Sequence, residues 1–278
     1  MIEMVDQELE PLELELFLNG VFRRYGYDFR NYARRSLSRR VRRAVVREDL
    51  TSISALLARV LRDPACMARL VEDLAVHVTA MFRDPEFHRG VRERVIPMLR
   101  TRPFIRVWHA GCSTGEEVYS LAIVLHEEGL YERSRLYATD ICEGALERAS
   151  RGMFPLHTMR ENTRNYLRAG GRCDFSSYYT AGEQQTVFRR FLRENMVFSQ
   201  HNLVSDPPFN EFDLILCRNV LIYFDAGLRS RVHRLLYDSL TETGILGLGT
   251  GEALEAELEG RYSQLATEHR LFVKVPSS

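Results

Sequence analysis

The feature that most constrains the fold is a short apolar run that ends in a glycine turn and passes directly into a helical pattern. The run covers residues 105–110, the turn reads Gly111-Cys-Ser-Thr-Gly115, and the helical pattern starts at Glu116. A strand, a glycine-containing turn and a helix start bring bare backbone and N–H groups next to a ligand. The segment therefore predicts a ligand site at the carboxyl edge of a parallel sheet.

The rest of the C-terminal part continues this alternation. Further strands are expected at residues 136–140, 196–199, 212–217, 244–249 and 272–275. One helix is expected after the strand at 136–140 and ends near residue 151, and another covers about 226–240. Strands that alternate with helices are typical of a doubly wound α/β sheet.

The first eighty residues instead predict helices. Apolar residues repeat at helical spacing over residues 53–61 and 67–78, and Asp63-Pro64 is a helix start signal between them. Residues 12–18 alternate Leu and Glu, which also fits a strand. We expect a helix there because the neighbouring segments are helical and no turn partner is present.

A basic helix is expected within this region. Ten arginines lie between Arg23 and Arg47, where Asp28 is the single acid, and an acidic segment precedes them. At 100° per residue, one face carries Leu37, Val41, Ala44 and Val45, and the opposite face carries Arg35, Arg39, Arg42 and Arg43. A solvated face is the alternative, but like charges at this spacing repel and solvated faces usually mix signs. The pattern favours an anionic partner, although 38 basic and 38 acidic residues balance in the whole chain.

The next expected strand ends in an acid. Asp140 ends that strand, where a carboxylate can hold both hydroxyls of a ribose. The turn lacks the GxGxxG spacing, and Glu116 and Glu117 stand where a pyrophosphate would lie. A cationic nucleoside such as S-adenosylmethionine therefore fits better than a dinucleotide.

Several classes of protein are excluded. The five cysteines form no CxxC motif and the histidines show no metal spacing, so no disulfide framework and no metal are expected. No 18-residue stretch lacks charge, and the acidic N-terminus is no secretory signal. The expected location is the cytoplasm, without membrane insertion.

Four motifs resemble one family. They are residues 109–122 (HAGCSTGEEVYSLA), 212–225 (FDLILCRNVLIYFD), 79–84 (TAMFRD) and 32–43 (YARRSLSRRVRR). The motifs occur along the chain in the family's order, and over roughly residues 12–275 the sequence is similar to the chemotaxis receptor methyltransferases of the CheR family. The resemblance implies a protein-glutamate O-methyltransferase that uses S-adenosyl-L-methionine and releases S-adenosyl-L-homocysteine. It also implies an α/β fold with a helical N-terminal domain over residues 1–80, a Rossmann-like domain over 81–278, and an antiparallel β-subdomain inserted at 155–202.

The resemblance also implies the site. Cofactor contacts carried over onto this sequence fall on His77, Thr79, Arg83, Glu117, Asp140, Asn202, Leu203, Arg218 and Asn219. His77 stands where the family more often has Asn, and Asp84 replaces a Glu with little expected effect. Arg83 and Tyr223 are the implied catalytic residues. Arg83 is expected to hold the cofactor carboxylate or to orient the incoming glutamate, and Tyr223 to orient the methyl transfer without acting as a base.

The implied partner is the cytoplasmic domain of a chemoreceptor, whose acidic helices suit the face formed by Arg35, Arg39, Arg42 and Arg43. Residues 186–192 and 196–201 are candidate strands of the insertion, which in some family members grips a receptor's C-terminal peptide. The chain is expected to act as a monomer.

Three alternatives remain open. One is a methyltransferase of the same kind that acts on a signalling protein outside chemotaxis. Another is a cofactor-sensing interaction protein without activity, which the presence of Arg83, Glu117, Asp140 and Tyr223 disfavours. The third, a nucleic-acid methyltransferase, is disfavoured because no aromatic-polar motif for a flipped base lies near Asn219.

Overall fold

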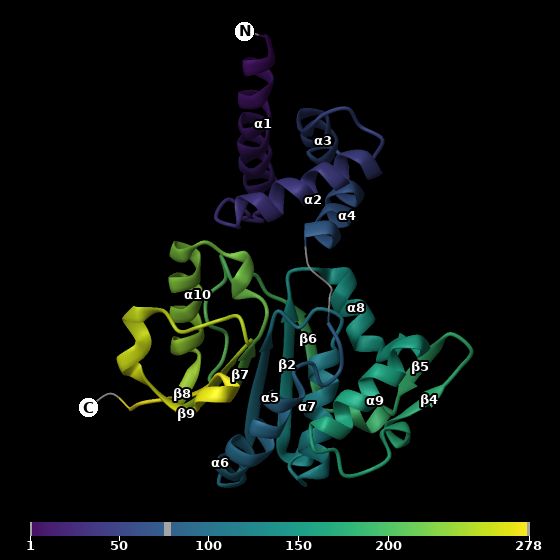
Figure 1. Ribbon diagram of the computed structural model, residues 1–278, viewed down its shortest axis with the longest axis vertical. Helices are drawn as coiled ribbons and strands as arrows, with labels where there is room; N and C mark the ends of the chain where they lie inside the picture. Colours follow the sequence, from purple (N-terminus) through teal and green to yellow (C-terminus); the bar gives the residue numbers. More distant parts are fainter. Residues whose placement is uncertain (1, 75–78, 277–278) are drawn as a thin grey trace.

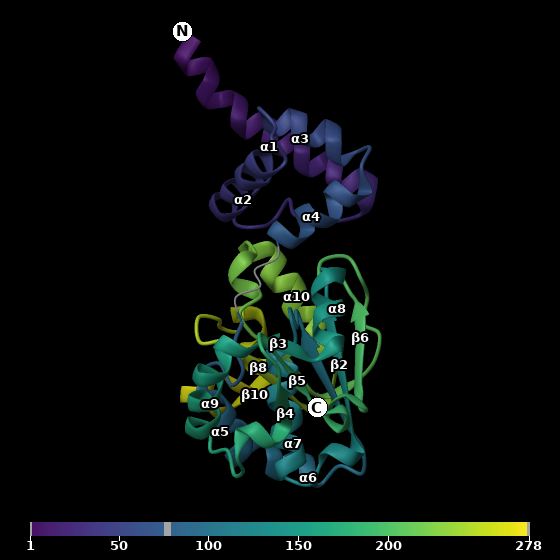
Figure 2. The same ribbon diagram turned by 90° about the vertical axis from the view of Figure 1, so that its right-hand side faces the viewer.

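The computed structural model describes residues 2–74 and 79–276, which form a helical lobe and an α/β lobe. Both views place the helical lobe over one end of the α/β lobe (Figures 1 and 2). Within the described residues, no helix combines the length and the apolar character needed to cross a membrane.

The helical lobe is built from the helices α1 (Ile2–Tyr25), α2 (Arg34–Arg47), α3 (Ile53–Val60) and α4 (Pro64–Leu74), of which the last three are amphipathic. Residues 12–18 are helical, as predicted, because Phe17 and Leu18 of α1 are buried in the bundle core. The predicted apolar face of α2 is buried as well. α3 starts where the Ser52 side chain accepts a hydrogen bond from the Ala55 N–H, a normal N-cap.

The α/β lobe contains a seven-stranded sheet in the order β6-β2-β1-β7-β8-β10-β9. The strands are β1 (Ile105–Ala110), β2 (Ser134–Asp140), β6 (Met196–Gln200), β7 (Phe212–Cys217), β8 (Leu240–Leu248), β9 (Tyr262–Ala266) and β10 (Leu271–Lys274). The first five in spatial order are parallel, and β10 pairs antiparallel with β8 and β9. The predicted α/β fold is confirmed. β8 starts earlier than expected, and β9 was not predicted.

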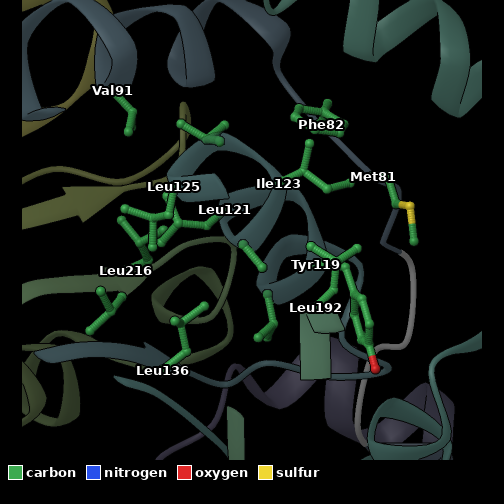
Figure 3. Packing of buried hydrophobic residues seen from close by; sticks show 14 of the residues in the cluster. Met81, Phe82, Val91, Tyr119, Leu121, Ile123, Leu125, Leu136, Leu192 and Leu216 are labelled. Atoms are coloured by element: carbon green, nitrogen blue, oxygen red, sulfur yellow. The ribbon is translucent and has the colours of Figure 1, made fainter. Parts of the chain in front are cut away.

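Helices cover the sheet. They are α5 (Pro85–Gly90), α6 (Ile96–Arg100), α7 (Glu116–Glu127), α8 (Glu143–Arg151), α9 (Met159–Arg168) and α10 (Ala226–Asp238), with a π-helical turn at Val91–Val95 between α5 and α6. α7 follows the glycine turn and is buried without interruption from Val118 to Leu125. Figure 3 shows Leu121 and Leu125 of this helix close to Leu216 of β7 in the main core cluster. This packing fixes the start of α7 at the carboxyl edge of the sheet.

The insertion carries a small antiparallel sheet of β3 (Met153–Pro155), β5 (Gln185–Phe188) and β4 (Tyr179–Ala181), in that order. Of the two candidate strands, 186–192 overlaps β5, which ends at Phe188. The assignment of residues 196–201 to the insertion is wrong, because Met196–Gln200 is β6 of the large sheet and pairs in parallel with β2. A parallel pairing with an existing strand edge satisfies its backbone groups. The domain boundaries, next to residues 75–78 outside the described part, stay a prediction.

Candidate active site

A cavity of about 1130 Å³, its open mouth included, lies where the carboxyl ends of β1, β2 and β7 meet. The helical lobe contributes Phe29, Tyr32 and Leu74 to its wall. The structure brings nearly all the predicted residues to this wall, namely Thr79, Arg83, Glu117, Asp140, Asn202, Leu203, Arg218, Asn219 and Tyr223. His77 lies outside the described residues. The functional roles of these residues remain predictions, but their convergence at one cavity is a finding.

The two glycines of the turn adopt a backbone conformation that residues with side chains rarely adopt. Gly111 and Gly115 have φ of 78° and 94°, in the left-handed region that glycine tolerates best. A Cβ on Gly111 would lie 2.5 Å from a Val220 methyl group, and one on Gly115 would lie 2.9 Å from the Ala149 Cβ. The glycines therefore let the loop after β7 and helix α8 approach the turn closely.

Asp140 ties this turn to the end of β2. One carboxylate oxygen accepts the Ser113 N–H at 2.8 Å, and the other accepts the Cys142 N–H at 3.0 Å. A carboxylate offers about four lone-pair positions, so these two bonds leave capacity for a ligand. Asp140 lines the cavity, which agrees with the expectation of a ribose contact there.

Arg218 lies between two carboxylates. Its Nη1 atom is 2.7 Å from Glu117, its Nη2 atom is 2.7 Å from Asp84, and its guanidinium lies 3.9 Å from the centre of the Phe87 ring. The Arg218 side chain is 2% exposed. Asp84, which was expected to matter little, thus holds a buried cation of the cavity wall.

Glu117 is ionised as a result. Burial raises the pKa of Glu117, but Arg218 and the hydrogen bond with His109 lower it by more than burial raises it. The resulting pKa is about 2. The sequence suggested that this carboxylate faces a cationic ligand. The structure shows that this carboxylate already pairs with an arginine of the chain itself, which it shares with Asp84.

The basic helix reaches the cavity through a residue that the sequence did not single out. The Arg40 guanidinium lies 5.3 Å from the centre of the Tyr223 ring and donates a hydrogen bond to the Leu74 carbonyl. Just before α2, the Ala33 N–H donates to the Tyr223 carbonyl at 2.9 Å. Burial lowers the pKa of Arg40, and Tyr223 opposes that shift. At helical spacing, Arg40 lies to one side of the predicted cationic face. The sequence pattern therefore gave no reason to expect its contact with Tyr223.

The outer face of α2 is exposed at all four predicted positions, Arg35, Arg39, Arg42 and Arg43. Arg42 nevertheless forms a two-point ion pair with Glu10 of α1, with distances of 2.6 and 2.8 Å. The acidic segment of α1 therefore neutralises part of the cationic face, so the two charge runs are not independent.

His88 is a further residue of the cavity wall that the sequence did not identify. Its side chain is fully buried, and burial lowers its pKa to about 3, so the ring is neutral at pH 7. Neither ring nitrogen has a hydrogen-bond partner among the described residues. In the same part of the chain, no three His, Cys, Asp or Glu side chains are arranged to hold a metal ion.

The cavity at the carboxyl ends of the parallel strands, the glycine turn and the acid at the end of β2 are what a methyltransferase that uses S-adenosylmethionine needs to hold its cofactor. The chain belongs to the CheR methyltransferase family, as predicted. Residues 77–271 match the family description "CheR methyltransferase, SAM binding domain", and residues 12–75 match "CheR methyltransferase, all-alpha domain".

Relatives are similar over most of the chain. "Putative methyltransferase Cher3" of Pseudomonas putida is 44% identical over 98% of this chain and 100% of its own length. "Chemotaxis protein methyltransferase 2" of Pseudomonas aeruginosa is 31% identical over 78% of this chain and 76% of its own length. In a 104.1 kDa uncharacterized protein of Rhodobacter capsulatus, the match is 33% identical over 88% of this chain and covers only 26% of the relative.

The residues present fit this cofactor. The cavity offers Asp140 with spare acceptor capacity, aromatic walls at Phe29 and Tyr32, and the buried His88 ring without a partner among the described residues. When bound, S-adenosylmethionine supplies an electrophilic methyl group on a sulfonium.

Proposed function

We propose that this chain methylates glutamate side chains on the cytoplasmic helices of chemoreceptors, which yields glutamyl methyl esters for sensory adaptation. One observation supports this proposal most strongly. The cationic helix α2 and the residue before it contact the predicted active-site tyrosine, through Arg40 beside the ring and Ala33 on the backbone. An acidic helix that lies on α2 would therefore present its carboxylates next to the cavity. The relatives named as chemotaxis methyltransferases agree with this substrate class.

For this methyl transfer the protein mainly has to position the glutamate carboxylate and the cofactor. A glutamate carboxylate has a pKa near 4.3 and is ionised at neutral pH, so no general base is needed. The chain's residues must align the carboxylate with the methyl group and exclude water. We assign Arg83 to hold the cofactor carboxylate or to orient the glutamate, and Tyr223 to orient the attack through its hydroxyl. We assign Phe29 and Tyr32, which line the cavity, to exclude water.

The cofactor contacts follow the same proposal. Thr79, Asn202, Leu203 and Asn219 line the cavity, and Asp140 is assigned to the ribose. Glu117 and Arg218 act as an ion pair that shapes the cavity wall, and Arg218 is shared with Asp84.

Receptor docking is assigned to the exposed arginines of α2. Arg39 and Arg43 are the sharpest positions to test, because they are exposed and i, i+4 spaced, whereas Arg42 is already paired with Glu10. Arg39→Glu with Arg43→Glu should bind S-adenosylmethionine like the parent and should lower kcat/KM for a receptor fragment at least tenfold at low salt.

The matched control is Arg160→Glu with Arg164→Glu on α9. These arginines are exposed at the same spacing, and their reversal changes the net charge equally. The assay supplies methyl-labelled S-adenosylmethionine with either a receptor cytoplasmic fragment or RNA. Equal receptor methylation by both double variants would refute docking on α2. Label on RNA but not on the receptor fragment would refute the proposed function.

A further inference from the structure

The loop that follows β7 carries three residues of the proposed site, Arg218, Asn219 and Tyr223. It is irregular: Asn219 has φ of 60°, which is uncommon for a residue with a side chain, and Tyr223 ends a short 3₁₀ turn at Leu221–Tyr223. A loop of this kind keeps one conformation only where its surroundings hold it. The question is which group does so.

Glu252 is that group. It follows β8, is 4% exposed, and does not line the cavity. Its Oε1 atom accepts the N–H groups of Val220 and Leu221, both at 2.8 Å. Its Oε2 atom accepts the N–H groups of Asn219 at 2.9 Å and Gly249 at 2.7 Å. Three consecutive peptide N–H groups of the loop therefore converge on one buried carboxylate.

This arrangement fixes the loop rather than merely covering it. Successive N–H groups that point into one concavity form an anion-binding nest. The left-handed conformation of Asn219, followed by the right-handed one of Val220, directs the next N–H groups to the same side as that of Asn219. The carboxylate thereby sets the peptide planes from which the Asn219 side chain and the 3₁₀ turn of Tyr223 start. Hydrogen bonds to a charged acceptor are also among the strongest in proteins.

The backbone at Gly249 is shaped for the same contact. A Cβ on Gly249 would lie 2.7 Å from the Glu252 Oε2 atom and 2.9 Å from the Asn219 nitrogen. Glycine at this position lets the turn after β8 approach the loop closely enough for one carboxylate to bridge both.

From this geometry we infer that Glu252 is a positioning residue for methyl transfer, which acts by holding the Arg218–Tyr223 loop in its reactive conformation. The inference deepens the proposed function and rests on it for the role of Tyr223. A glutamine cannot replace Glu252, because its NH₂ group would face N–H donors and leave them unsatisfied.

The test compares Glu252→Gln with Glu255→Gln. Glu255 is a neighbouring acid that pairs with Arg229 at 2.9 Å and has no contact with the loop among the described hydrogen bonds. Glu252→Gln should raise the Kd for S-adenosylmethionine at least tenfold and lower the single-turnover rate at saturating cofactor at least tenfold. Glu255→Gln should change both less than twofold.

A double-variant cycle separates positioning from general stabilisation. Tyr223→Phe should slow single turnover in the parent but change the rate less than twofold in the Glu252→Gln background, since a displaced hydroxyl no longer contributes. If Glu252 only stabilised the fold, the rate losses caused by Tyr223→Phe and Glu252→Gln would be independent and would multiply in the double variant. A lower Tm with parent-like Kd and rate would also overturn the inference.

Two further arms keep the test decisive. If Glu252→Gln does not fold, Glu252→Asp carries the test, because the shorter side chain withdraws the carboxylate from the loop N–H groups while leaving its charge. The Kd for S-adenosylmethionine needs no methyl acceptor. If the parent methylates no receptor fragment, the proposed function fails, whereas an unchanged Kd in the folded variants would show that the inference about Glu252 itself is wrong.

Discussion

Replacing Arg218 by methionine should expose how the cavity wall is held together. In the parent, the buried Arg218 side chain lies 2.7 Å from both Glu117 and Asp84. The substitution keeps an apolar side chain against Phe87 but removes the cation. Glu117, whose side chain is 19% exposed, is then left as a largely buried carboxylate, whereas Asp84 is 38% exposed and can be hydrated.

The expected loss follows from these burials. Removing one partner of a buried ion pair costs about 3–5 kcal/mol because the remaining charge is uncompensated. Since Asp84 can turn to water, we expect the lower end, about 3 kcal/mol of the free energy of unfolding at pH 7. The matched control is Arg148→Gln, which breaks an exposed pair with Glu72 and should cost about 0–1 kcal/mol.

The pH dependence has a defined sign. In the parent, the pKa of Glu117 is about 2 against an ordinary 4.5, so its contribution to stability is present above pH 4.5 and is lost as pH falls toward 2. Without Arg218, burial raises the pKa of Glu117, and protonation then relieves the buried charge. The stability deficit of Arg218→Met should therefore shrink as pH falls from 7 to 5.

Urea denaturation at both pH values measures these differences. The single tryptophan, Trp108, is fully buried in β1 and reports on the α/β lobe. A deficit at pH 7 no larger than that of Arg148→Gln, or a deficit that grows toward pH 5, would refute the reasoning.

Three further predictions concern single residues. Asp140→Asn should weaken the binding of S-adenosylmethionine by about 1.5–3 kcal/mol in calorimetry. An affinity equal to that of the parent would refute the assignment of Asp140 to the ribose. Arg40→Gln should lower kcat for receptor about fivefold with cofactor affinity unchanged, because its contact with the Tyr223 ring is worth about 1 kcal/mol, and an unchanged kcat would show that Arg40 plays no part in methyl transfer. Glu48→Gln should lower the free energy of unfolding of the helical lobe by about 1–2 kcal/mol at pH 7. Arg69 holds the pKa of Glu48 at about 2, so this loss should vanish as pH falls from 4.5 to 2, and a loss that persists in acid denaturation curves would refute it.

The sequence predicted part of the cavity wall because the signals for it are local. The glycine turn after β1 and the acid at the end of β2 follow from strand-to-helix patterning, and parallel strands bring their carboxyl ends to one edge. The amphipathic pattern of α2 likewise predicted its buried and exposed faces.

Partners that are distant in the chain could not be predicted in this way. Arg218 and Glu117 are 101 residues apart, and nothing in either local pattern indicates that they pair. The same holds for Glu10 and Arg42, and for Glu252, whose partners are backbone N–H groups. The misassigned β6 has a similar cause, because a short apolar run does not reveal which strand edge it will join.

The chemical nature of the methylated product tests the central claim most directly. A receptor cytoplasmic fragment methylated with methyl-labelled S-adenosylmethionine should release its label as methanol in mild base, since glutamyl methyl esters hydrolyse under those conditions. Substituting the methylated glutamates by aspartate or alanine in the fragment should abolish the label. Base-stable label on the receptor fragment, or undiminished label after those substitutions, would contradict the account.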